Sequence, residues 1–142
     1  MAGLPNIENK DAPLRVILAD DHIRVLDGIR KLLGPDCEVV RSVSNGRMAL
    51  EAAMELGPDL MVLDIEMPEM DGIRAAQEMR RRGLKILILF LTVHGDEDYL
   101  AVARTLGNGY ILKSRMATDL RHAIDEAMAG HFFASQHTME PG

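Results

Sequence analysis

Residues 60–72 read LMVLDIEMPEMDG, and this stretch decides the fold. Its first part, Leu60–Leu63, is wholly apolar and predicts a buried strand that ends at Asp64. The Asp71–Gly72 pair is typical of a helix start, and the amphipathic run Gly72–Arg82 predicts the helix itself. A buried strand, a short turn and a helix are the first half of a βαβ unit.

The same alternation extends in both directions along the chain. Further strands are predicted at Leu14–Ala19, Cys37–Val43, Lys85–Leu91 and Gly109–Leu112, and further helices at 22–33, 44–57, 96–106 and 118–129. Five strands alternating with five helices indicate right-handed crossovers and a parallel sheet covered on both faces. We therefore predict an α/β fold: a flavodoxin-like three-layer αβα sandwich with a five-stranded parallel sheet of order 2-1-3-4-5.

Length and composition indicate a single globular domain. The chain has 142 residues and a net charge of −6, which argues against this segment holding a nucleic acid backbone by itself. Residues 1–13 are predicted to be a disordered arm, 14–130 the folded domain, and 131–142 a tail or the start of a linker. The longest apolar run, Ile86–Leu91, is too short to span a membrane, and nothing resembles a signal peptide, so we expect a cytoplasmic protein.

Polar residues follow most of the predicted strands. Asp20–Asp21 follow the first, Asp64 the third, Thr92 the fourth and Lys113 the fifth. In an open α/β sheet, ligands bind at the carboxyl ends of the strands where strand order reverses, so these side chains would converge in one crevice. Two carboxylates about 4 Å apart repel by roughly 4 kcal/mol at an effective dielectric constant near 20. The carboxylates would therefore either raise one another's pKa values or recruit a cation, and all-oxygen ligands favour Mg²⁺.

Such a site has the parts for phosphoryl transfer to a carboxylate. Each residue also has a simpler interpretation. A lone Asp at a strand end is commonly a helix cap, and His22 reads as a helix-start residue rather than a metal ligand. Tyr110 reads as a half-buried strand aromatic, and Arg80–Arg82 reads as a solvated helix end.

Four stretches together resemble a known family. Residues 18–22 (LADDH), 62–72 (VLDIEMPEMDG), 91–94 (LTVH) and 109–114 (GYILKS) resemble the receiver domain of two-component response regulators. The first and last look most like the branch whose members usually carry a LuxR-type helix-turn-helix. The resemblance implies that the domain is not an enzyme acting on other substrates: it catalyses only its own phosphorylation and dephosphorylation.

The resemblance also implies roles for individual residues. Asp64 would accept a phosphoryl group from a sensor histidine kinase. Asp21 and Asp64 would bind Mg²⁺ directly, with the Glu66 backbone carbonyl as a third ligand and Asp20 acting through water. Lys113 would pair with the phosphoryl oxygens.

The implied switch lies next to this site. Thr92 would be drawn toward the phosphate and Tyr110 would move inward with it, which would repack the face formed by the fourth helix, fifth strand and fifth helix. The implied partners are the kinase and a second copy in a homodimer. DNA would be contacted only through an output domain outside this chain, and no membrane would be involved.

Two departures from the family pattern stand out. Residues 105–109 read TLGNG where many receivers have a small-residue turn, and Ser114 replaces the proline that often follows the lysine. Two other functions stay open. An aspartate-nucleophile phosphatase of the haloacid dehalogenase type would also use Asp and Mg²⁺, but its DxD pair should lie on the first strand, with the general acid two residues after the nucleophile. Here Asp20 and Asp21 are adjacent, and the pair with that spacing, Asp64 and Glu66, follows the third strand. A pseudo-receiver would act only as a scaffold.

Overall fold

Within residues 12–136, which the computed structural model describes, the chain forms a parallel sheet with helices on both sides. The elements are β1 Leu14–Ala19, α1 Ile23–Leu32, β2 Cys37–Val43, α2 Gly46–Leu56, β3 Leu60–Asp64, α3 Gly72–Arg81, β4 Leu87–Thr92, α4 Glu97–Leu106, β5 Gly109–Leu112, a 3-10 turn Lys113–Arg115, α5 Met116–Met128 and β6 Phe133–Ala134. The strand order is β2-β1-β3-β4-β5-β6. This confirms the predicted topology and adds one short strand.

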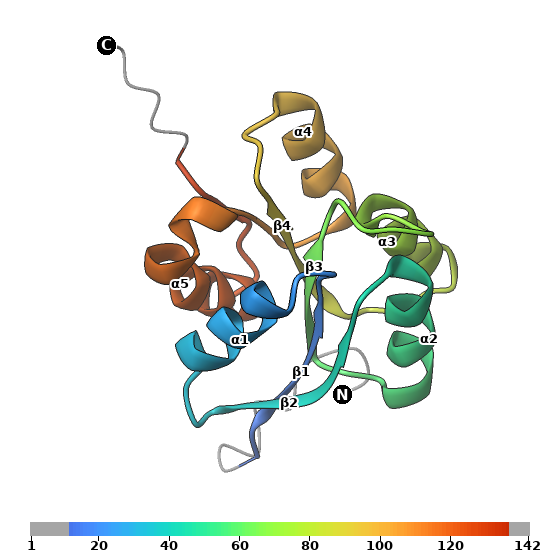
Figure 1. Ribbon diagram of the computed structural model, residues 1–142, viewed down its shortest axis with the longest axis horizontal. Coiled ribbons are helices and arrows are strands. Elements are labelled where there is room, and N and C mark those ends of the chain that lie inside the picture. The colour runs from blue at the N-terminus through green and yellow to red at the C-terminus, as the bar shows by residue number, and fades with distance from the viewer. Residues whose placement is uncertain (1–11, 137–142) are drawn as a thin grey trace.

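The helices cover the sheet in two layers. Helices α1 and α5 pack on one face, and α2, α3 and α4 pack on the other (Figure 1). Side chains alternate along each strand, so neighbours belong to different layers: in β1, Ile17 faces α2 and α3, whereas Leu18 faces α1 and α5. Both side chains are fully buried, as expected for a central strand of a parallel sheet.

The sixth strand was not predicted. Phe133 pairs with Gly109 and Ala134 pairs with Tyr110, so β6 covers the edge of β5. A two-residue strand contains no periodicity that a sequence pattern could reveal. Residues 1–11 of the predicted arm and 137–142 of the predicted tail lie outside the described residues.

A close backbone approach explains the glycine at the start of α3. A Cβ atom on Gly72 would lie 2.1 Å from the Asp64 carbonyl oxygen. The Gly72 N–H also donates to the Ile65 carbonyl at 2.8 Å, and Asp71 caps the helix by accepting from the Arg74 N–H. The predicted helix start is therefore confirmed, and it holds the end of β3 against α3.

The prediction that Arg80 belongs to a solvated helix end is wrong. Arg80 is partly buried, and its guanidinium donates to the carbonyls of Leu84 and Leu106 and to the Asn108 side chain. Asn108 in turn accepts from the Ile88 N–H at 2.9 Å. These bonds organise the TLGNG turn, whose backbone groups needed partners that local sequence could not identify.

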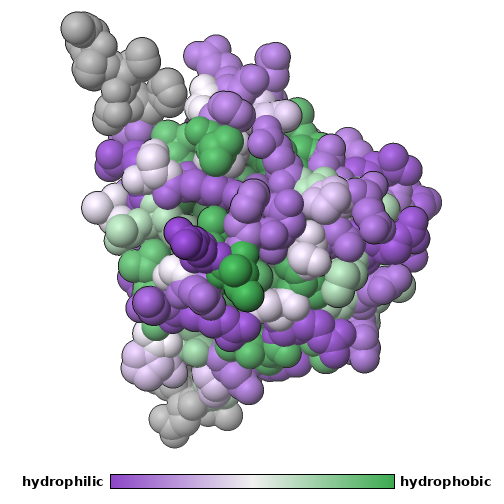
Figure 2. Space-filling model, viewed as in Figure 1, coloured by the Kyte–Doolittle hydropathy of each residue, from purple (hydrophilic) through white to green (hydrophobic). Residues whose placement is uncertain are grey.

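The face of the molecule drawn in Figure 2 is mostly polar. On the side drawn in Figure 2, hydrophobic side chains appear only as separate small patches among hydrophilic ones. In the described range, no helix combines the length and the apolar character needed to cross a bilayer.

Candidate functional site

The carboxyl ends of β1, β3 and β5 bring three charged side chains together. The Lys113 Nζ lies 2.9 Å from Asp20 Oδ2 and 3.2 Å from Asp64 Oδ2. Asp20 directly follows β1, Asp64 is the last residue of β3, and Lys113 directly follows β5. The ammonium therefore joins two carboxylates from strands that are adjacent only because the chain order reverses between β1 and β3.

Burial gives this ion triad unusual electrostatics. Asp20 is fully buried and Asp64 is 1% exposed. Burial, together with the charge of Asp20, raises the pKa of Asp64 to about 6, although Lys113 acts in the opposite direction. The pKa of Lys113 is raised because its pairing with Asp20 and Asp64 outweighs the opposing effect of burial. Burial is thus the main cause of the Asp64 shift, whereas the ion pairs with the two acids cause the Lys113 shift.

A second positive charge would fit at this site. Apart from Lys113, Asp20 Oδ2 and Asp64 Oδ2 have no partner among residues 12–136. Asp20, Asp21, His22 and Asp64 also offer ligand atoms that all lie within 4.8 Å of one another. Three carboxylates with unused oxygens match the donors that a hard divalent cation prefers.

The His22 side chain contacts both acids that follow β1, in addition to its place at the start of α1. It is the residue that precedes the first turn of α1, and its Nδ1 lies 3.3 Å from Asp20 Oδ1 and 3.2 Å from Asp21 Oδ1. Its backbone N–H also donates to Asp20 Oδ1 at 2.9 Å, which fits the predicted place at a helix start. The ring contact depends on how the loop after β1 folds back, which the sequence does not show.

Glu66 contributes to the site through its backbone. Its N–H donates to Asp64 Oδ1 at 3.2 Å, whereas its side chain is exposed. The contact orients the Asp64 carboxylate from the side of the β3–α3 loop.

Thr92 and Tyr110 are linked through one loop. Thr92 is fully buried; its Oγ1 accepts from the His94 N–H at 3.2 Å and donates to the His94 carbonyl at 3.3 Å. The Tyr110 hydroxyl donates its proton to that same carbonyl at 2.9 Å, and the Asp96 carbonyl lies 3.3 Å from it as a second possible acceptor. A displacement of Thr92 would therefore reach Tyr110 through His94.

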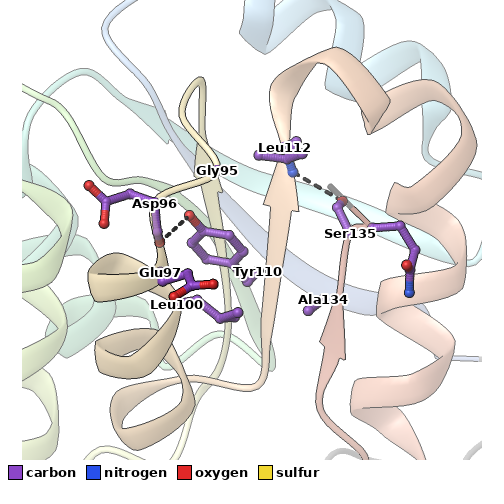
Figure 3. Close-up of a pocket in the computed structure, with 9 residues that line it drawn as sticks. Gly95, Asp96, Glu97, Leu100, Tyr110, Leu112, Ala134 and Ser135 are labelled. Carbon is purple, nitrogen blue, oxygen red and sulfur yellow. Dashed lines mark hydrogen bonds between the residues drawn. The ribbon is translucent and has the colours of Figure 1, made fainter. Parts of the chain in front are cut away.

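Tyr110 is not the half-buried aromatic that one interpretation expected, since it is only 3% exposed. Burial raises the pKa of its hydroxyl. Figure 3 shows the ring between α4 and β5, in the wall of a pocket of about 280 Å³ that also includes Leu100 and Ala134. The pocket lies on the face predicted to repack.

The fold and these strand-end residues define a class of protein. The chain belongs to the response regulator receiver domain family, whose pattern matches residues 16–125.

Individual relatives indicate which members of this family the chain resembles. The chain is 33% identical over 127 residues to the nitrate/nitrite response regulator protein NarL of Escherichia coli strain K12, covering 87% of this chain and 59% of NarL. The chain thus spans somewhat over half the length of that relative.

Solved structures agree. A LuxR-family two-component response regulator from Aurantimonas sp. SI85-9A1 is 29% identical with a TM-score of 0.80, covering 92% of this chain and 91% of that one. The isolated receiver domain of RcsB from Salmonella enterica serovar Typhimurium, solved with the phosphomimetic BeF3⁻, is 28% identical with a TM-score of 0.80. It covers 87% of this chain and 94% of that one. The chain is therefore a receiver domain similar to those of NarL and LuxR-family regulators.

Proposed function

We propose that this chain is a signalling phospho-acceptor in which Asp64 takes a phosphoryl group from a sensor histidine kinase. The observation that carries this proposal is the single ammonium of Lys113, which lies between the buried carboxylates of Asp20 and Asp64. Such an arrangement leaves excess negative charge that can attract a metal ion, and an ammonium group that can pair with an incoming phosphoryl group.

The proposed reaction follows from this arrangement. An Asp64 carboxylate oxygen attacks phosphorus in line, the bond from phosphorus to the donor nitrogen breaks, and the electron pair leaves with the donor imidazole. The Lys113 ammonium then pairs with a phosphoryl oxygen. Asp21, Asp64 and the Glu66 carbonyl would hold Mg²⁺, with Asp20 acting through water, and the ion would supply the remaining positive charge.

The expected switch uses contacts already described. A phosphoryl oxygen on Asp64 gives Thr92 Oγ1 a new acceptor, in competition with its present partner at His94. Loss of that partner frees the loop to which the Tyr110 hydroxyl is bonded. The face formed by α4, β5 and α5 then presents a different surface to partners.

The process that this signal controls is inferred from the relatives of the chain. Because relatives such as NarL are response regulators longer than this chain, we infer a role in controlling transcription through a LuxR-type DNA-binding domain. A cytoplasmic location and homodimer formation stay predictions.

The test is chemical phosphorylation. Acetyl phosphate with Mg²⁺ should give the wild-type chain one base-labile phosphate, which intact-mass spectrometry measures directly. Asp64→Ala should take up none, whereas Asp27→Asn, which changes an exposed acid on α1, should behave as wild type.

Uptake by Asp64→Ala at the wild-type rate would show that another group is the acceptor. Continuous release of phosphate from an ester by the wild-type chain, without a stable modified form, would favour the phosphatase alternative. Folded wild-type chain that takes up no phosphate would favour the scaffold alternative.

A further inference from the structure

Strand β6 is tied to β5 immediately before Lys113. The Ser135 N–H donates to the Tyr110 carbonyl at 2.8 Å, and the Leu112 N–H donates to Ser135 Oγ at 3.1 Å. The side chain of Ser135 therefore takes the place of the next backbone partner after the strand pairing ends at Ala134 (Figure 3). The Leu112 N–H would otherwise be a buried donor without a partner.

The Ser135 hydroxyl is itself held by a second contact. It donates its single proton to Asp119 Oδ2 at 2.7 Å, while its lone pair accepts from Leu112. Ser135 and Asp119 are 9% and 7% exposed. A short hydrogen bond to a charged acceptor in a buried setting fixes the hydroxyl in one orientation.

Asp119 also holds the residue that ends the turn after Lys113. Its Oδ2 accepts from Arg115 Nε at 3.1 Å, and its Oδ1 accepts from Thr118 Oγ1 at 3.1 Å. Arg115 closes the 3-10 turn that begins with Lys113. One carboxylate is therefore linked to residues on both sides of the lysine: before it to the Leu112 N–H through Ser135, and after it directly to the Arg115 side chain.

We propose that Ser135 and Asp119 are positioning residues that aim Lys113 at the phosphoryl acceptor. Neither touches Asp20 or Asp64, and both act through the backbone that flanks Lys113. The inference rests on the phosphoryl-transfer function proposed above and deepens it, because strand β6 then shares a hydrogen-bond network with the reacting site. By thermodynamic linkage, an event that moves Lys113 must change how firmly β6 is held.

The first test compares Ser135→Ala with Ser135→Thr, which keeps the hydroxyl, and with Ser42→Ala. Ser42 is a matched control because it lies on β2, at the far edge of the sheet, and its hydroxyl accepts from the Arg30 guanidinium. The measured quantities are the maximal rate of phosphorylation at saturating acetyl phosphate and the Mg²⁺ affinity by calorimetry.

In Ser135→Ala we expect the maximal rate to fall roughly fivefold, as for a net hydrogen bond lost, with Mg²⁺ affinity within about twofold of wild type because no metal-site atom is changed. Ser135→Thr should restore most of the rate, and Ser42→Ala should match wild type. An unchanged rate in Ser135→Ala overturns the inference. So does a loss of Mg²⁺ affinity equal to the loss of rate, which would indicate general loosening.

A second measurement needs no variant. In the wild-type chain with Mg²⁺, hydrogen exchange at the Leu112 and Ser135 amides should change severalfold when BeF3⁻ is added. Identical exchange with and without BeF3⁻ overturns the coupling. If the wild-type chain forms no phosphate on Asp64, the function proposed above is wrong. If phosphate forms but hydrogen exchange at the Leu112 and Ser135 amides does not change, only this inference is wrong.

Discussion

At the scale of single residues, Lys113 matters for the stability of the fold because its ammonium lies between two buried acids. Replacing it with Ala leaves Asp20 and Asp64 facing each other, and breaking a buried ion pair typically costs about 3 kcal/mol or more. We expect the free energy of unfolding at pH 7.5, without metal, to fall by about that amount. Urea unfolding measures it, with the exposed Lys85→Ala as control.

The same variant has a defined pH dependence. The pKa of Asp64 is raised to about 6 by burial and by the charge of Asp20, so its ionisation opposes folding. Stability from this group is greatest at low pH and is lost as the pH rises through that pKa. Without Lys113, the ionised Asp64 carboxylate opposes folding more strongly. The loss of unfolding free energy in Lys113→Ala should therefore be smaller at pH 5.5 than at pH 7.5. A deficit that is constant or larger at pH 5.5 would contradict this account.

At the scale of elements, the start of α3 sets the position of the end of β3. Gly72→Ala would place a methyl group 2.1 Å from the Asp64 carbonyl oxygen, so the backbone must shift. We expect destabilisation by about 2–3 kcal/mol, as for severe overpacking, together with slower phosphorylation because Asp64 moves.

Gly28→Ala in α1 is the matched control. The nearest atom to its added methyl is Met116 Cε at 3.6 Å, an ordinary contact, and Ala favours the helix by about 0.5–1 kcal/mol. Thermal melts of the two variants should therefore shift in opposite directions. Equal shifts of one sign would show that the close approach at Gly72 is not the cause.

At the scale of the whole molecule, excess negative charge makes stability depend on cations. The chain carries a net charge of −6, and Asp20, Asp21 and Asp64 concentrate three acids at one sheet edge. Because Mg²⁺ would bind only the folded site, a concentration 100 times its Kd should stabilise by about 2.7 kcal/mol. Asp21→Asn should reduce this gain, whereas Asp27→Asn should keep it. Calorimetric melts with Mg²⁺ and with EDTA measure both, and equal gains in the two variants would argue against Asp21 as a ligand.

Much of this molecule follows from the amino-acid sequence alone. The order of elements follows from apolar runs alternating with amphipathic runs, and the strand-end rule places Asp20, Asp64 and Lys113 in one crevice, as the structure confirms. The order of elements is a local pattern, whereas the convergence also depends on the strand order of the sheet, which the sequence predicted from the alternation of elements and the structure confirms.

Other features depended on the tertiary structure. The partners of Arg80 at Leu84, Leu106 and Asn108, and the joining of Ser135 to Leu112 and Asp119, involve groups with no fixed spacing along the chain. A buried polar group takes whichever donor or acceptor packing brings within reach, so its partner is known only when the chain is folded. The sequence by itself determined which chemical groups stand at the strand ends; the fold decided which of them touch, and so how the lysine is held.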